Sequence, residues 1–193
     1  MVNIFKEHLI GKGFNRKCYQ HPENDKLCIK VDLPGTPSSD SDRERGYYRH
    51  LIKRNVSWDM VPQYYGDIDT NIGLGSVYDL ILDGDGSASK TLENYLDAKH
   101  NFDDLLQPFQ ALKTYLLQQR IIIGTLYPRN VLCQKEGKSI TKMILCDDIG
   151  SSDFIPICNY SRYFAELKIN RKWNMFEARL SSDYSIKLPK GSN

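Results

Sequence analysis

The sequence has few cysteines and no paired cysteine motif. Its five cysteines lie at positions 18, 28, 133, 146 and 158, and no two of them form a C-x-x-C pair. An odd, unpaired set argues against both a disulfide framework and a zinc knuckle. Free thiols are typical of a reducing compartment, so the sequence predicts a cytoplasmic protein.

The sequence also lacks a long apolar run. The amino-terminal stretch MVNIFKEHLIGKG is interrupted by Lys6, Glu7 and His8, so it contains no signal-peptide core. No later apolar run approaches the roughly 20 residues that a helix needs to span a bilayer. We therefore expect no integral membrane segment.

The chain has no strong charge of one sign. It carries 26 Lys and Arg residues against 24 Asp and Glu residues, a net charge of +2. Nucleic-acid-binding domains usually carry a clear basic excess, so nucleic acid is not expected as a partner. At 193 residues, 40% of them hydrophobic, the chain is long enough to form one domain or two small lobes that share an interface.

Two stretches rich in Gly, Pro, Ser and Asp divide the sequence. They are PGTPSSDSD at 34–42 and DGDGSAS at 83–89, and both are typical of connecting loops. The region before the second loop is rich in strand patterns, and the region after it is mostly helical. This change predicts an amino-terminal lobe over residues 1–83 that binds nucleotide, and a shortened helical lobe over residues 84–193, within a single domain.

The order of the expected elements indicates the fold class. Ser41 and Glu44 have the spacing of a capping box, which predicts a helix that begins near Ser41. Helical spacing returns after residue 90 and predicts a longer helix that ends near Gln119 and a last one at about 163–180. Strands are expected at 27–31, 61–69, 75–82, 130–133 and 143–146. This order predicts an α+β, protein-kinase-like two-lobe fold with a shortened carboxy-terminal lobe.

The stretch LCIKV places a lysine inside an apolar strand. Period-two alternation sends Cys28 and Lys30 to one face, opposite the apolar residues between them. Glu44 on the following helix has two open roles, as the ion-pair partner of Lys30 or as part of its own helix cap. Upstream, Gly11 and Gly13 would let a hairpin tip lie close to phosphate groups, although Arg16 stands where a further glycine is expected.

Asn130 and the stretch CDDIG form a candidate metal site. Asn130 opens one strand of an expected hairpin, and Asp148 follows the other strand, so their oxygens should meet at its open end. Carboxylate and amide oxygens suit Mg²⁺, which also takes phosphate oxygens and water. Asp147 is the alternative ligand, because successive residues face opposite ways and only one of the two can point to the metal.

Thr125 occupies the position of the catalytic base. In an active kinase loop, an aspartate lies five residues before the asparagine, and Thr125 stands there in this chain. A threonine hydroxyl is no base near neutral pH. Only 43 residues follow Gly150, which is too few for the usual platform that holds a protein substrate.

The sequence resembles the YrbL family, the PhoP regulatory network proteins of bacteria, over nearly its whole length. The resemblance is carried by GKGFNRKCYQHP, LCIKV, RERGYYRHL, VPQYYG, VYDLI, YPRNVLC and CDDIG. It implies a kinase-like fold that binds ATP and Mg²⁺ and a link to an envelope-stress regulon. The implied site comprises Gly11, Gly13 and Cys28 around the nucleotide, Lys30 and Glu44 as the ion pair, Asn130 and Asp148 for metal, and a hinge of Tyr78, Asp79, Leu80, Ile81 and Leu82 whose backbone reads adenine.

Two functions remain open at this point. The first is an ATP-dependent phosphotransferase without a side-chain base, which acts on a small molecule or an envelope sugar. The second is a catalytically inactive pseudokinase, in which bound nucleotide shapes a surface for a protein partner. The loss of the base at Thr125 favours the second, and the retention of Lys30, Asn130 and Asp148 predicts a nucleotide site in both.

Overall fold

A computed structural model describes residues 1–37, 39–150 and 157–188 of the chain. In this part the strands form a five-stranded antiparallel sheet, in the order β1-β2-β3-β5-β4, and a three-stranded sheet, in the order β6-β7-β8. The strands and helices are β1 (Leu9–Lys12), β2 (Arg16–His21), β3 (Asn24–Asp32), α1 (Ser39–Lys53), β4 (Tyr64–Thr70), β5 (Gly73–Asp79), β6 (Lys90–Thr91), α2 (Leu92–Asp97), α3 (Leu106–Gln119), β7 (Val131–Glu136), β8 (Ser139–Leu145), α4 (Ile157–Tyr160) and α5 (Arg162–Tyr184), with short 3-10 turns at Lys6–His8, Phe102–Leu105 and Pro128–Asn130.

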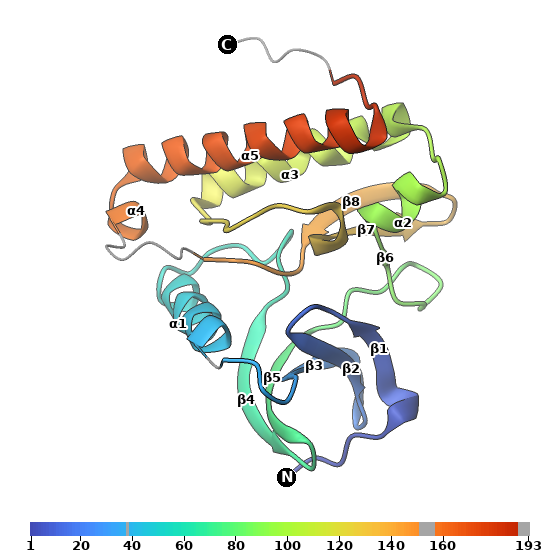
Figure 1. The fold of residues 1–193 in the computed structure, drawn as a ribbon, viewed down its shortest axis with the longest axis vertical. Helices are drawn as coiled ribbons and strands as arrows, with labels where there is room; N and C mark the ends of the chain where they lie inside the picture. The colour runs from blue at the N-terminus through green and yellow to red at the C-terminus, as the bar shows by residue number, and fades with distance from the viewer. Residues whose placement is uncertain (38, 151–156, 189–193) are drawn as a thin grey trace.

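The five-stranded sheet lies at the amino-terminal end of the molecule, below the second sheet in Figure 1. The predicted alternation along β3 is confirmed. Ile29 and Val31 are buried in a small core on one face of the sheet. Cys28 and Lys30 lie on the other face and line a cavity. The period of the strand therefore aims the lysine into the molecule.

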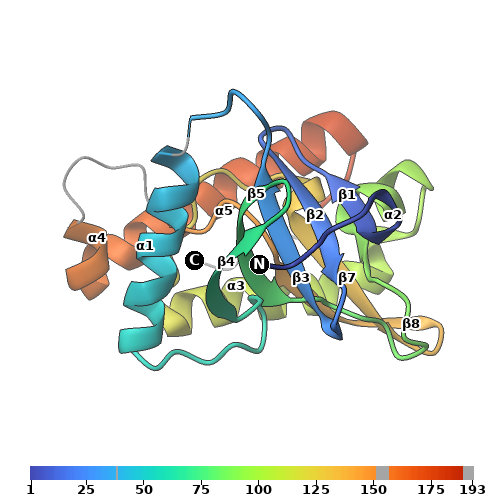
Figure 2. The ribbon, with the colours of Figure 1, turned by 90° about the horizontal axis from the view of Figure 1, so that it is seen from below.

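The helix α1 runs beside the sheet, next to β4 and β5 (Figure 2). It begins at Ser39, so the predicted capping box of Ser41 and Glu44 is wrong. Ser41 lies within the first turn, and its hydroxyl donates to Asp32 Oδ1 at 2.5 Å, at the end of β3. Glu44 is thereby free of a capping role and is buried inside the protein.

The second predicted connector, residues 83–89, is attached to the second sheet. The Asp83 carboxyl group is buried, and its Oδ1 accepts from the Ser89 hydroxyl at 2.6 Å and the Lys135 N–H at 2.9 Å. Its Oδ2 lies 3.3 Å from Lys135 Nζ, and the Gly84 N–H donates to the Lys135 carbonyl at 2.8 Å. The connector is therefore fixed to β7.

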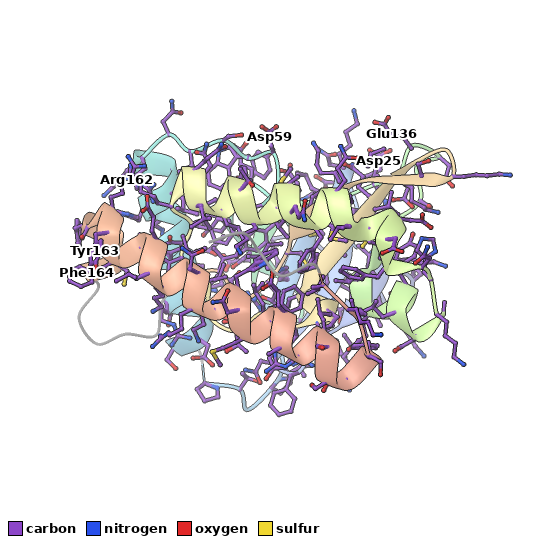
Figure 3. The ribbon with its side chains drawn as sticks, turned by 90° about the horizontal axis from the view of Figure 1, so that it is seen from above. Asp25, Asp59, Glu136, Arg162, Tyr163 and Phe164 are labelled. Atoms are coloured by element: carbon purple, nitrogen blue, oxygen red, sulfur yellow. The ribbon has the colours of Figure 1, made fainter. Side chains whose placement is uncertain are left out.

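The helices of the carboxy-terminal half cover the second sheet. α3 ends at Gln119 as predicted, with Arg120 in the left-handed region at φ 50°. Figure 1 shows α5 lying along α3. Between the two helices, the ring centres of Phe109 and Trp173 are 4.6 Å apart. At the start of α5, Tyr163 and Phe164 project outward (Figure 3) and are exposed. The buried residues of α5 extend from Ala165 to Leu180, and Tyr163 and Phe164 lie outside this packed part.

The predicted mixed α+β organisation is confirmed, and the five cysteines are free thiols, as expected. Among the described residues, no helix combines the length and the apolar character that crossing a membrane requires. The division at residue 83 stays a prediction.

Candidate nucleotide site

A cavity of about 860 Å³ brings the predicted site residues together. Its lining comes from the β1–β2 hairpin, β3, α1, the end of β5, the loop before β7 and the segment after β8. Of the predicted residues, the lining includes Gly11, Gly13, Cys28, Lys30, Glu44, Tyr78, Asp79, Leu80, Ile81, Thr125, Asn130, Asp147 and Asp148. Leu82 does not line this cavity, and its carbonyl accepts from the Gln134 side chain at 2.8 Å.

The β1–β2 hairpin lines one side of the cavity. The Gly13 N–H donates to the Arg16 carbonyl at 2.8 Å and closes the turn. A Cβ at Gly11 would meet nothing within 4 Å, so this strand end is open on the side where a side chain would stand.

Lys30 is held deep in the cavity by oxygens. Its Nζ donates to the Cys146 carbonyl at 2.5 Å, lies 3.8 Å from Asp147 Oδ1, and stands 5.0 Å from the centre of the Tyr78 ring. Burial disfavours the charged form of Lys30, but the surrounding negative charges, with Asp147 the largest and Glu44 next, together outweigh burial and raise the pKa of the lysine. Lys30 is therefore a fixed positive charge inside the cavity.

Glu44 is paired with Arg16 instead of Lys30. Glu44 Oε2 lies 2.6 Å from Arg16 Nη2, and Glu44 Oε1 accepts from the Tyr78 hydroxyl at 3.2 Å. No direct Lys30–Glu44 ion pair is present in the described part of the chain, so the predicted pairing does not form here. The physical reason is that the guanidinium of Arg16 lies between the two carboxylates and donates to both Glu44 Oε2 and Asp147 Oδ1.

This role of Arg16 was not predicted from the sequence. On β2, Cys18 lies opposite Lys30, and Arg16 is two residues from Cys18, so Arg16 shares their face of the sheet. The alternation of side chains along β2 is the sequence signal that indicates this role. Arg16 thus adds a second cation beside Lys30.

The two aspartates of CDDIG have separate environments. Asp147 faces the cations Arg16 and Lys30. Burial disfavours its charged form, but the charges of Lys30 and Arg16 outweigh burial, and the pKa of Asp147 is lowered. Asp148 has φ 58°, in the left-handed region, and its Oδ2 accepts the Thr125 N–H at 2.5 Å. The turn at Asp148 therefore points its carboxyl group to the loop before β7.

Gly124 makes this arrangement possible. A Cβ at this position would overlap the carboxyl group of Asp148, and the Gly124 N–H donates to the Asp148 carbonyl at 2.8 Å. Only glycine leaves the space that the carboxyl group occupies. Two neighbouring backbone N–H groups, of Gly124 and Thr125, thus fix Asp148 in place.

Asn130 meets the same loop from the other side. Its Nδ2 donates to the Thr125 carbonyl at 3.5 Å, and its own carbonyl accepts from the Cys146 N–H at 2.8 Å. Asn130 and Asp148 therefore converge on Thr125. The donor set fits Mg²⁺, since amide and carboxylate oxygens are hard ligands. Among the described residues, no group of three or more His, Cys, Asp or Glu side chains is suited to hold a metal ion, so a metal here would need further oxygens from a ligand.

Tyr78 differs from the other hinge residues. Its ring is fully buried and packs against Tyr48 at 5.1 Å and Tyr64 at 5.3 Å, measured between ring centres. The side chain closes the inner end of the cavity next to Lys30. The polypeptide that lines the cavity beyond it is residues 79–81, which is shorter than the predicted hinge.

The fold is similar to that of a protein kinase domain. The crystal structure of a double mutant of the Mycobacterium tuberculosis PknI kinase domain matches with a TM-score of 0.52 at 15% sequence identity. The match covers 73% of this chain and 56% of that domain, so this chain spans little more than half the length of the kinase domain. The protein therefore has a kinase-like fold, as the sequence predicted.

The family follows from closer relatives. Residues 2–181 match the family described as PhoP regulatory network protein YrbL. The chain is 36% identical over 184 residues to the YrbL proteins of Escherichia coli (strain K12) and Shigella flexneri, across 93% of this chain and 88% of each relative. The chain belongs to the YrbL family.

Proposed function

We propose that this protein binds ATP with Mg²⁺ in the 860 Å³ cavity. The observation that carries the proposal is the convergence of Lys30, Asn130 and Asp148 on one cavity of a size typical for small-molecule ligands. ATP is large and strongly anionic, and the cavity offers two buried cations at its inner end. The partner is thus a nucleotide, and the free cysteines favour action in the cytoplasm.

Different groups of the cavity are proposed to contact different parts of the nucleotide. The backbone of residues 79–81 supports the adenine, while Lys30 orients the phosphates through its charge. Asp148 and Asn130 are the proposed metal ligands, since Asp147 already faces Arg16 and Lys30. A magnesium ion held by Asp148 and Asn130 would supply positive charge that offsets the charge of the phosphates.

The proposed reaction is slow phosphoryl transfer to a small molecule or an envelope sugar. Thr125 supplies no carboxylate, and a general base is typically worth about 10²- to 10⁴-fold in rate. Positioning and electrostatics carry most of phosphoryl transfer, so Lys30, Asn130 and Asp148 account for a residual rate. The acceptor is proposed to be small because the chain spans little more than half of a kinase domain.

The alternative is a pseudokinase that regulates a partner in a PhoP-linked stress response. Two observations favour it: Thr125 at the base position, and the ion pairs of Arg16 with Glu44 and Asp147, which already satisfy this cation without a ligand. In this case bound nucleotide stabilises one shape of the protein, and no product forms.

Thermal unfolding with and without ATP and Mg²⁺ tests the nucleotide site. ATP should raise the melting temperature more with Mg²⁺ than without it, because a ligand that binds only the folded state stabilises it by RT ln(1 + [L]/Kd). Asp148→Asn should remove the Mg²⁺-dependent increment, and the matched variant Asp147→Asn should leave most of it. A melting temperature indifferent to millimolar Mg²⁺ and ATP would refute the proposal.

Product analysis distinguishes the two functions. Incubation with Mg²⁺ and ATP gives ADP or AMP if the protein is an enzyme, and unchanged ATP if it is a pseudokinase. Thr125→Asp restores a carboxylate at the base position. It should accelerate product formation by a slow phosphotransferase, and it should leave a nucleotide-reading module without turnover.

A further inference from the structure

Two cysteines lie together on the sheet face that lines the cavity. On the paired strands β2 and β3, Cys18 is opposite Lys30 and Cys28 is opposite Gln20, so the two thiols are diagonal neighbours on one face. Both line the cavity. The Cys28 thiol also lies 3.5 Å from the Asp79 carbonyl, which belongs to the segment that we assign to adenine.

The charges around Cys18 favour its thiolate. The neighbouring Cys28 thiol lowers the pKa of Cys18, burial and the carboxylate of Asp147 oppose this effect, and the cations Lys30 and Arg16 reinforce it. The thiolate is the nucleophilic form of cysteine.

The neighbouring thiols differ. Burial raises the pKa of Cys133 and of Cys146 to about 12, and the neighbouring Cys18 thiol raises the pKa of Cys28 well above its usual value. Cys18 is half-buried and faces the cavity, which gives a small reagent access to it. Cys158 is also half-buried, but it does not line the cavity.

We propose that Cys18 is a redox modification site, which a hydroperoxide oxidises and Cys28 then converts to a Cys18–Cys28 disulfide that blocks nucleotide binding. In the first step the Cys18 sulfur attacks one peroxide oxygen, an S–O bond forms and the O–O bond breaks. The sulfur is oxidised to a sulfenic acid, and the peroxide is reduced to water or an alcohol. In the second step the Cys28 sulfur attacks the Cys18 sulfur, the S–S bond forms, and hydroxide leaves with the Cys28 proton as water.

Closing this bond requires a local movement of the strands. Diagonal neighbours on paired strands are about 7–8 Å apart between Cα atoms, and a disulfide usually needs less than about 7 Å. The register of β2 and β3 shifts between Gln20 and His21, beside the pair, and at such an irregularity the ladder is locally disrupted and the strand bends. The approach displaces Cys28 from Asp79 and narrows the cavity where the adenine is proposed to lie.

Thiol mapping of the full-length protein tests the modification without nucleotide. The reduced protein is treated with equimolar hydrogen peroxide at neutral pH, free thiols are alkylated, and peptides are mapped by mass spectrometry. The wild type should lose two free thiols per chain and yield a Cys18–Cys28 peptide. In Cys28→Ser, oxidation should stop at a Cys18 sulfenic acid, which dimedone traps. In Cys18→Ser, the other cysteines should stay in the thiol form. Cys158→Ser, the control, should behave like the wild type.

Three results would overturn the thiol chemistry: oxidation of Cys158 before Cys18, loss of two thiols in Cys18→Ser, or a wild-type reaction that never forms a bond to Cys28. The blocking effect rests on the proposed function and has its own measurement. Mg²⁺ with ATP should raise the melting temperature of the reduced protein and leave that of the oxidised protein unchanged, while peroxide-treated Cys18→Ser keeps the increase.

An equal increase in the reduced and oxidised wild type would refute the blocking step. No increase in the reduced protein would refute the proposed nucleotide binding and the blocking step together. The disulfide would then be judged by the thiol mapping alone, so the two failures are distinguishable.

Discussion

Gly124→Ala tests how firmly the protein holds the Asp148 carboxyl group. The new methyl group would overlap that carboxyl group, and the overlap has two forms of relief. If the carboxylate stays, overpacking costs about 1–3 kcal/mol. If it turns away, the Asp148–Thr125 hydrogen bond is lost, and removing a bond to a charged group costs about 1.5–3 kcal/mol. Asp148 is partly exposed, which reduces the second figure, so we expect the free energy of unfolding to fall by about 2 kcal/mol.

The assay is urea unfolding followed by circular dichroism, with Gly46→Ala as the matched control. Gly46 lies inside α1, and a Cβ there would meet nothing within 4 Å. Alanine in a helix interior is more stable than glycine by about 0.5–1 kcal/mol, so the control should gain stability. If Gly124→Ala is as stable as the wild type, the carboxyl group is not held against this glycine, and the reasoning is refuted.

Two further predictions concern the cations and their carboxylate. Lys30→Ala should weaken ATP binding about ten- to a hundred-fold, as measured by calorimetry, because one charge-assisted contact is worth roughly 1.5–3 kcal/mol. The control is Lys26→Ala, at an exposed position on the same strand. Equal ATP affinities of Lys30→Ala and the wild type would contradict the prediction. The lowered pKa of Asp147 means that its carboxylate stabilises the fold fully above the unfolded pKa of about 4 and loses this effect as the pH falls through the folded pKa. Between about pH 5 and about pH 3, the melting temperature of Asp147→Asn should therefore fall less than that of the wild type. An equal or larger fall would show that the contacts with Arg16 and Lys30 do not stabilise the charged form of Asp147.

Local periodicity was sufficient to place the site on its strands and loops. The alternation in LCIKV gave the correct face for Lys30, because side-chain direction in a strand depends only on the parity of the position. The helix α1 begins at Ser39, two residues before the predicted Ser41. Ser39 and Ser41 are equally good helix starts by type, and the contact that decides between them, Ser41 to Asp32, is made to another element.

The ion pairs were not predictable in the same way. Arg16, Glu44 and Asp147 come from three distant parts of the sequence, and their pairing depends on which strands are neighbours. The separate roles of Asp147 and Asp148 depend on the positive φ of one residue, which the letters DD do not specify. Contacts between elements therefore decide the electrostatics of the cavity, and local sequence decides only which groups are available.

The attachment of Asp83 to β7 has a mechanical consequence for the two sheets. Before the connector, the Leu80 N–H donates to the Lys26 carbonyl of β3 at 2.8 Å. The carbonyl of the next residue, Ile81, accepts from the N–H of Ser89, at the end of the connector, at 2.9 Å. Asp83 then fixes the following residues to the second sheet through Lys135. Along this connection, a flexing of one sheet against the other would turn the backbone between Leu80, which is held to β3, and Leu82, which is held to β7, and Leu80 and Ile81 line the cavity. Opening the molecule and releasing what the cavity holds would be a single movement.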